Sequence, residues 1–173
     1  MTCTQLDPEH WRIRFDEPDA YLVIHILAQL ERHYRLSVDD LSPAQQAYWR
    51  GNVVRSAEAS PEEIEASNEL LSEARAELRS ERLNLVEAWL RDFELAEDRD
   101  PWVVELDATE RDEFIAMIND RRLLLALEFA ITEKEMDQPL QDFTDDTRRM
   151  VRMEIGILGS MIGIILDPEP ESS

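Results

Sequence analysis

The stretch MINDRRLLLALEF, which covers Met117–Phe129, has the apolar spacing of a buried helix but is interrupted by four consecutive polar residues. On a helical wheel, Arg121 and Arg122 fall on either side of the direction that the apolar residues define. Asn119 and Asp120 point well away from that direction. The interruption is therefore more than a solvated face, and it bears directly on how this helix packs.

Two interpretations of this segment follow from the residues. An arginine at the border of a core packs its aliphatic stem and extends its guanidinium group to a carboxylate or a backbone carbonyl, so the two arginines can be structural anchors. The helix is apolar all round from Leu123 to Ile131, so it must be covered on several sides, by its own fold or by a partner. The alternative is a binding site, whose predicted partner-binding residues are Asn119, Asp120, Arg121 and Arg122.

The rest of the chain predicts a mainly helical protein. Helices are expected over about residues 19–36, 43–50, 60–96, 107–132 and 144–166. The third begins at a capping box with proline at the first helical position, SPEE from Ser60 to Glu63. Ile64, Leu71, Leu78 and Leu85 then recur seven residues apart. Because this helix would be long for the domain, a break within residues 80–84 is the competing prediction.

Two short stretches alternate apolar and polar residues as strands do. They are WRIRF at residues 11–15 and WVVEL at residues 102–106, and each is followed by an aspartate and a helix. We expect them to pair with each other. The predicted fold is therefore all-α: a single domain over residues 1–173, with about five helices, one of them long, and a small two-stranded β element. Residues 1–10 and 167–173 are expected to be flexible.

Charge and composition restrict the classes of function. The net charge is −21, from 39 acidic and 18 basic residues, so the surface repels phosphate backbones and anionic membranes. Nucleic-acid and membrane partners are therefore not expected, and a basic protein partner suits the charge. A single cysteine, Cys3, and the lack of a signal-peptide pattern lead us to expect a cytoplasmic protein.

The sequence offers little that points to an enzyme. It has no Glu-x-x-His pair, no His-Glu-x-x-His or Cys-x-x-Cys motif and no glycine-rich phosphate loop. His25 and His33 lie eight residues apart on an apolar helix and are interpreted as histidines at the edge of the core. We therefore predict no catalytic residue, no metal site and no cofactor.

Glutamates recur at every fourth position of the long predicted helix, at residues 65, 69, 73, 77 and 81. Like charges at this spacing destabilise a helix slightly, and the arginines of the same helix are not three or four residues away. The row can be a solvated face, a docking stripe for a basic partner, or a set of partners for Arg148, Arg149 and Arg152.

The last predicted helix carries IGILGSMIGIIL at residues 155–166, which is too short to cross a bilayer. Glycine costs nearly 1 kcal/mol in a helix interior, so a packing reason is expected. One interpretation is close approach to another core helix. The other is a homodimer interface formed by Gly156, Gly159 and Gly163.

The segment FIAMINDRRLLLALEFAITEKE, residues 114–135, resembles a helix of the bacterial family called domain of unknown function twenty-seventeen. The likeness extends over about residues 10–166, although Ala126 stands where that family has a glycine. It implies an all-helical bacterial protein without an established activity, some of whose relatives are labelled as transcriptional regulators and some encoded beside the adaptor of an ATP-dependent protease. The residues that match that pattern are Asn119, Asp120, Arg122, Leu123, Leu125, Ile131, Thr132 and Glu133.

We therefore expect a non-enzymatic, cytoplasmic protein-interaction domain with a regulatory or adaptor-like role. The alternative is a DNA-associated transcriptional regulator, for which Arg148, Arg149 and Arg152 form the only dense basic cluster. An uncharacterised enzyme is the third hypothesis, and it requires a pocket that holds carboxylates with strongly perturbed pKa values.

Overall fold

The computed structural model describes residues 1–50, 60–94 and 102–170. Five helices of eight or more residues are present in these ranges: α1 (Glu17–Arg35), α2 (Pro43–Arg50), α3 (Pro61–Glu94), α4 (Ala108–Glu128) and α6 (Asp146–Leu166). A four-residue helix, α5 (Glu133–Met136), and two single 3₁₀ turns, η1 (Val38–Asp40) and η2 (Leu140–Asp142), complete the helical part. The predicted bundle of about five helices with one long helix is confirmed.

The β element is larger than predicted. Strands β2 (His10–Phe15) and β3 (Trp102–Asp107) pair antiparallel, with Trp11 opposite Leu106 and Phe15 opposite Trp102, so the predicted pairing is confirmed. Strand β1 (Thr2–Asp7) adds to the other edge of β2, and the two-residue strand β4 (Glu169–Pro170) lies parallel to β1. The order is β3-β2-β1-β4, and side chains alternate between a buried and an exposed face.

Residues 1–10 were expected to be flexible, and the structure instead places Thr2–Asp7 in strand β1. The sequence of this strand, TCTQLD, has too few apolar residues to show the alternation of a half-buried strand. Its one fully buried side chain is Cys3, which is opposite Ile13 of β2 and 1% exposed. Backbone pairing along β2 therefore fixes this segment more than side-chain burial does.

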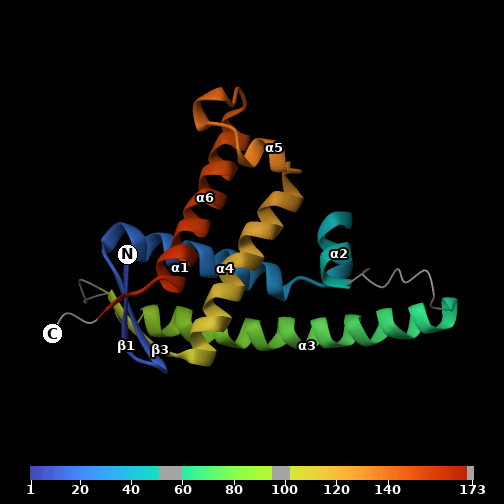
Figure 1. Cartoon of the computed structure of the whole chain (residues 1–173). Helices are drawn as coiled ribbons and strands as arrows, with labels where there is room; N and C mark the ends of the chain where they lie inside the picture. Colours follow the sequence, from blue (N-terminus) through green and yellow to red (C-terminus); the bar gives the residue numbers. More distant parts are fainter. Residues whose placement is uncertain (51–59, 95–101, 171–173) are drawn as a thin grey trace.

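The helices form two antiparallel pairs that cross each other (Figure 1). Helices α1 and α3 lie side by side and run in opposite directions, and α4 and α6 stand across them, with α5 at the far end of this second pair. The sheet lies beside the C-terminal end of α3. The main core is shared by the inner face of the sheet and by all four of these helices. None of the described helices is both long enough and apolar enough to cross a membrane.

Helix α3 runs from Pro61 to Glu94 without the break considered for residues 80–84. Ser60 and Glu63 exchange the two hydrogen bonds of the predicted capping box. Arg79, just before the expected break, and Arg82, within it, are buried against other helices, and Val86 follows one turn later. Tertiary contacts therefore hold the helix together where its length led us to consider a break.

Helix α4 ends four residues before the predicted boundary at Thr132. Its start is as predicted, with Asp107 and Glu110 forming a capping box. At its end, Ala130 has a φ of 46°, and the Ile131 backbone N–H donates to the Ala126 carbonyl. Ala130, in the left-handed conformation, ends the helix in the way that glycine usually does. Because the residue is alanine, the sequence does not predict a helix end at this position.

The burial of Cys3, the single cysteine, in strand β1 leads to a prediction about the reactivity of its thiol. Burial raises the pKa of its thiol, with the charge of Arg111 opposing that effect, so the folded protein should hold little thiolate. We expect a thiol reagent at neutral pH to modify Cys3 only at the rate of local or global unfolding, and quickly in denaturant. Fast modification of the native protein, followed by absorbance, would show that β1 does not stay paired.

Candidate functional site

Asp120, which the helical wheel placed away from the core, is 3% exposed and lies where four helices meet. Its Oδ2 atom accepts hydrogen bonds from the hydroxyl of Tyr34 in α1 and from Nη1 of Arg82 in α3, both at 2.7 Å. Its Oδ1 atom accepts from the hydroxyl of Tyr48 in α2, also at 2.7 Å. The placement of Asp120 was wrong because α4 is covered on two faces, and the second face is covered by polar side chains.

The protonation states of this cluster are fixed by burial and by charge. Burial, and then the Asp120 carboxylate, raise the pKa of Tyr34 and of Tyr48 well above that of a free tyrosine. Burial alone would lower the pKa of Arg82, but the attraction of Asp120 and Tyr34 and the hydrogen bonds to Asp120 and Glu113 together outweigh it, and the pKa is raised. Arg82 also donates to a second carboxylate, that of Glu113, at 3.2 Å. Asp120 thus accepts three hydrogen bonds from groups that keep their protons, and this geometry favours anchoring over proton transfer.

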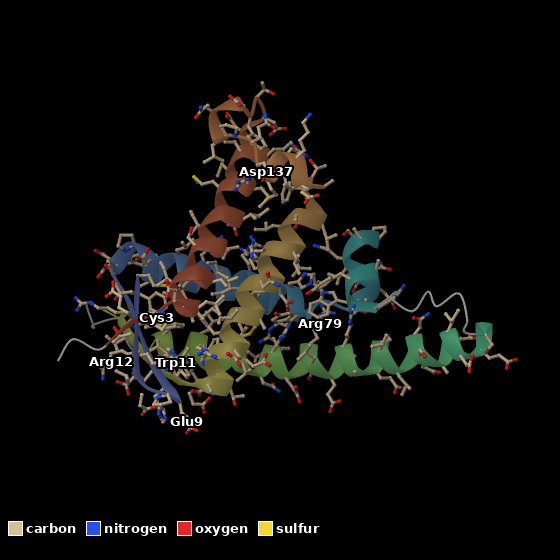
Figure 2. The ribbon with its side chains drawn as sticks, viewed as in Figure 1. Cys3, Glu9, Trp11, Arg12, Arg79 and Asp137 are labelled. Atoms are coloured by element: carbon tan, nitrogen blue, oxygen red, sulfur yellow. The ribbon has the colours of Figure 1, made fainter. Side chains whose placement is uncertain are left out.

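Two further arginines of α3 reach from the same side of the helix to backbone carbonyls. Arg79 donates to the carbonyl of His33 and, at 2.6 Å, to that of Leu36, so it satisfies the C-terminal end of α1. Its guanidinium group also lies over the ring of Trp49, 5.4 Å from the ring centre. Arg75 donates to the carbonyl of Tyr48 near the end of α2. Figure 2 shows Arg79 on the side of α3 that faces α1 and α2.

His33 lies at the edge of this cluster, which agrees with its interpretation as a core-edge histidine, whereas His25 is exposed and that interpretation was wrong for it. The indole N–H of Trp49 donates to its Nε2 atom at 2.9 Å, so that nitrogen must be unprotonated. Burial, and then the positive charge of Arg79, lower the pKa of His33 to about 4. The ring is therefore neutral at pH 7. Within the described residues, no group of histidine, cysteine and carboxylate side chains is arranged to hold a metal ion.

The two arginines of the predicted site face α6. The Nε and Nη2 atoms of Arg121 donate to one oxygen of Glu154 in α6, at 3.0 and 2.8 Å. Arg122 donates to the side chain of Asn119 at 3.3 Å, and its buried Nε atom has no hydrogen-bond partner. The structure thus separates the four residues, with Asp120 turned toward α1, α2 and α3 and the two arginines turned toward α6. Their role in binding a partner stays a prediction.

One hollow reaches this segment from outside. It has a volume of about 310 Å³, lies between α2, α3 and α4, and is lined in part by Tyr48, Arg75, Arg82, Asn119 and Asp120. Every charged group in its wall has a hydrogen-bond partner within the chain. The hollow is therefore the solvent edge of the Asp120 cluster.

The three glycines of the predicted dimer interface lie in different surroundings. A Cβ atom at Gly159 would lie 3.6 Å from the guanidinium carbon of Arg122, so this glycine faces α4. A Cβ at Gly156 would meet only Nη1 of Arg152, at 3.1 Å, whereas one at Gly163 would meet no atom within 4 Å. A Cβ at position 159 would thus make ordinary van der Waals contact with Arg122 inside the fold. The packing within the chain gives no reason for glycine at position 163.

Helix α6 also presents an apolar row to solvent, which the sequence analysis did not identify. Met150, Met153, Ile157 and Ile164 are exposed, from 64% at Met150 to about 36% at Ile157. The row borders an open groove of about 440 Å³ whose other wall includes Leu140 of η2. The sequence could not separate this row from the buried one because α6 is apolar on nearly every side from Ile155 to Leu166.

The predicted basic cluster is occupied within the chain. Arg148 donates to Glu135 at 2.5 Å and to the carbonyl of Phe129 at 2.7 Å, so it satisfies the end of α4. Arg152 donates to the carbonyls of Glu135 and Met136, and Arg149 pairs with Asp146 in its own helix. None of the three arginines pairs with the glutamate row of α3.

All five glutamates of that row, at residues 65, 69, 73, 77 and 81, are exposed. In the described part of the chain none of them forms an ion pair with a basic residue. Because successive members rotate around the helix, they do not form one continuous acidic surface. This agrees with their interpretation as a solvated face.

Comparison with known proteins identified no relative of this chain. No family model matches the chain, and no curated protein and no solved structure matches it. The resemblance to the family called domain of unknown function twenty-seventeen stays a prediction.

The buried ion pair predicts a large loss of stability when Asp120 is neutralised. Asp120→Asn keeps the shape but leaves the Arg82 guanidinium buried without its main counter-charge, which typically costs about 3–5 kcal/mol. The measurement is urea unfolding followed by circular dichroism. Asp112→Asn, an exposed carboxylate on the same helix, is the control and should change stability by less than about 0.5 kcal/mol. If Asp120→Asn lowers the free energy of unfolding by less than about 1 kcal/mol, the cluster is not needed to stabilise the fold.

His33 predicts a loss of stability in mild acid. Its pKa is about 4 in the folded chain and 6.5 as the ordinary value, so between these pH values the unfolded chain binds a proton that the folded chain does not. The free energy of unfolding should therefore fall as the pH falls from about 6.5 to about 4. His33→Gln keeps an acceptor for Trp49 but cannot titrate, so its curve should be flatter over this window. Parallel curves for the two proteins would contradict the assignment.

Proposed function

We propose that the chain is a non-enzymatic protein-interaction domain of the cytoplasm, with a regulatory or adaptor-like role, and that its binding surface is the outer face of α6. The outer face of α6 is defined here by Met150, Met153, Ile157 and Ile164 together with the small residues beside them, Gly156, Ser160 and Gly163. The exposed apolar row is the observation that carries this proposal.

An exposed row of this kind is unusual for this composition. One third of the residues of the chain are charged, yet the row extends over four turns of one helix with no charged side chain among its members. Removing apolar side chains from water contributes about 25 cal/mol per Å², so a row of four large side chains can supply much of the free energy of binding. Contiguous apolar patches on otherwise polar proteins mark interaction sites.

The predicted site residues support this surface from inside. Arg121 pairs with Glu154, and the guanidinium group of Arg122 packs against Gly159, so both arginines fix how α6 lies on α4. In this proposal, substitution of Arg121 or Arg122 weakens partner binding through the position of α6. The partner need not touch either guanidinium group.

No observation favours either of the two alternative functions, a DNA-associated regulator or an enzyme. A DNA-associated regulator would need Arg148, Arg149 and Arg152 on its contact surface. Arg148 and Arg152 bind groups of other elements of the chain, which leaves Arg149, paired only with the exposed Asp146, as the one exposed member of this cluster. An enzyme would need a reactive carboxylate, and Asp120 accepts three hydrogen bonds from groups that hold their protons.

A photo-crosslinking amino acid at Ile157 tests the proposed surface in living cells. We expect a discrete, light-dependent adduct that contains a second polypeptide. The same amino acid at Leu70, an exposed leucine of α3, should give none, because that side chain is not part of the proposed surface.

A second substitution assigns the adduct to one face. Ile164→Glu, on the outer face of α6, should abolish the adduct formed at Ile157, whereas Leu70→Glu should leave it unchanged. Absence of any protein adduct from Ile157 and from Met153, in chains that unfold at the wild-type urea concentration, would overturn the proposal.

A further inference from the structure

We infer that the partner of the outer face of α6 is the same face of a second copy of this chain, with the two α6 helices packed antiparallel about a two-fold axis near Ile157. This inference rests on the proposed function, because it identifies the protein that this surface binds. Spacing, the glycine at position 163 and the distribution of charge each support it.

The spacing of the exposed row fits the seam between two helices. Met150, Met153, Ile157, Ser160 and Ile164 follow one another at intervals of three and four residues, which keeps them along one side of a helix that packs at a small angle against another. The hydroxyl of Ser160 donates to the carbonyl of Gly156 at 3.1 Å, so it needs no partner across the seam.

The small residues explain how two such helices could approach closely. Gly156, Ser160 and Gly163 lie along one edge of the row, beside the larger Met153, Ile157 and Ile164. A ridge of large side chains next to a strip of small ones is self-complementary, since the ridge of one copy can lie on the strip of the other. Glycine at position 163 costs nearly 1 kcal/mol of helix stability and has no packing reason inside the chain, and a neighbouring helix would supply one.

Charge favours a second copy at this face more than at any other part of α6. Two chains of net charge −21 repel each other, so self-association needs a face without unpaired acidic groups. Asp19 of α1 also lines the groove beside the row, and its carboxylate pairs with the N-terminal amine of Met1. Between Met150 and Leu166 the only charged residues are Arg152 and Glu154. Arg152 binds the backbone carbonyls of Glu135 and Met136 in α5, and Glu154 is turned toward Arg121 of α4.

The ends of the row set the relative direction of the two helices. Arg149 and Asp167 are about five helical turns apart, so they project from the same side of α6, one at each end of the row. Both side chains are exposed. In an antiparallel pair, Arg149 of each copy lies near Asp167 of the other, at both ends. A parallel pair would place Arg149 near Arg149 and Asp167 near Asp167, which like charges disfavour.

Light scattering on the purified chain measures the predicted assembly. We expect a solution mass of twice the chain mass of 20.2 kDa at micromolar concentration. Ile157→Glu places two carboxylates together at the two-fold axis and should weaken dimerisation by about tenfold or more, while its circular dichroism spectrum stays that of the folded wild type. Gly163→Leu, whose Cβ would have open space within its own chain, should have the same effect by blocking close approach, and Leu70→Glu should leave the dimer intact.

A charge exchange tests the direction of the helices. Arg149→Asp and Asp167→Arg should each weaken the dimer, and the chain that carries both should dimerise as the wild type does. A parallel pair would show no such recovery, because each substitution would only exchange one like pair for another.

The outcomes separate this inference from the proposed function. A wild-type monomer at 100 µM would overturn the inference, and so would a dimer that survives both Ile157→Glu and Gly163→Leu in folded chains. If the Ile157 cross-link in cells then joins a different protein, the proposed function stands and its partner is not a second copy. If there is neither a dimer nor an adduct, both proposals fall.

Discussion

A single buried carboxylate organises the helical part of this protein. Asp120 is presented by α4 and accepts hydrogen bonds from α1, α2 and α3, so its position depends on all four helices at once. Burying a charge is costly unless it is paired and its remaining acceptor sites are filled. Arrangements that displace any one of these helices leave a charge or a hydroxyl group without its partner. The cluster therefore selects one packing among the many that apolar contacts alone would allow.

The short helix α2 shows this dependence most clearly. Eight residues are too few for a stable isolated helix in water. Its position is set by the hydrogen bond from Tyr48 to Asp120, the bond from Arg75 to the Tyr48 carbonyl, and the packing of Trp49 against His33 and Arg79. The polar cluster also leads outward to α6, because the residues that follow Asp120 bind Glu154 and pack on Gly159. The outer face of α6 is thus oriented by the same segment of α4.

The sequence predicted those parts of the fold that depend on local patterns, such as strand alternation and helix capping. The pairing of β2 with β3 followed from the shared alternation of Trp11 and Trp102, and the starts of α3 and α4 followed from capping boxes at Ser60 and Asp107. These features depend on a few neighbouring residues, so a single sequence contains them.

The features that the sequence did not predict depend on residues far apart in the chain. Charged residues are normally exposed, so nothing near Asp120, Arg79 or Arg82 indicates that all three are buried. The segment Asn119–Arg122 drew notice for its polarity, but the partners of Asp120 lie 38 to 86 residues away. The apolar composition of α6 likewise concealed which of its faces is buried.

The most direct test of the organising role of Asp120 is a double-mutant cycle with Arg82. The free energy of unfolding would be measured for the wild type, for Arg82→Met, for Asp120→Leu and for the chain with both substitutions. If the pair fixes the packing of the helices, each single change is strongly destabilising and the double change costs at least about 2 kcal/mol less than their sum. Additive losses would mean that the carboxylate and the guanidinium act independently, and the cluster would then lose its place at the centre of the fold.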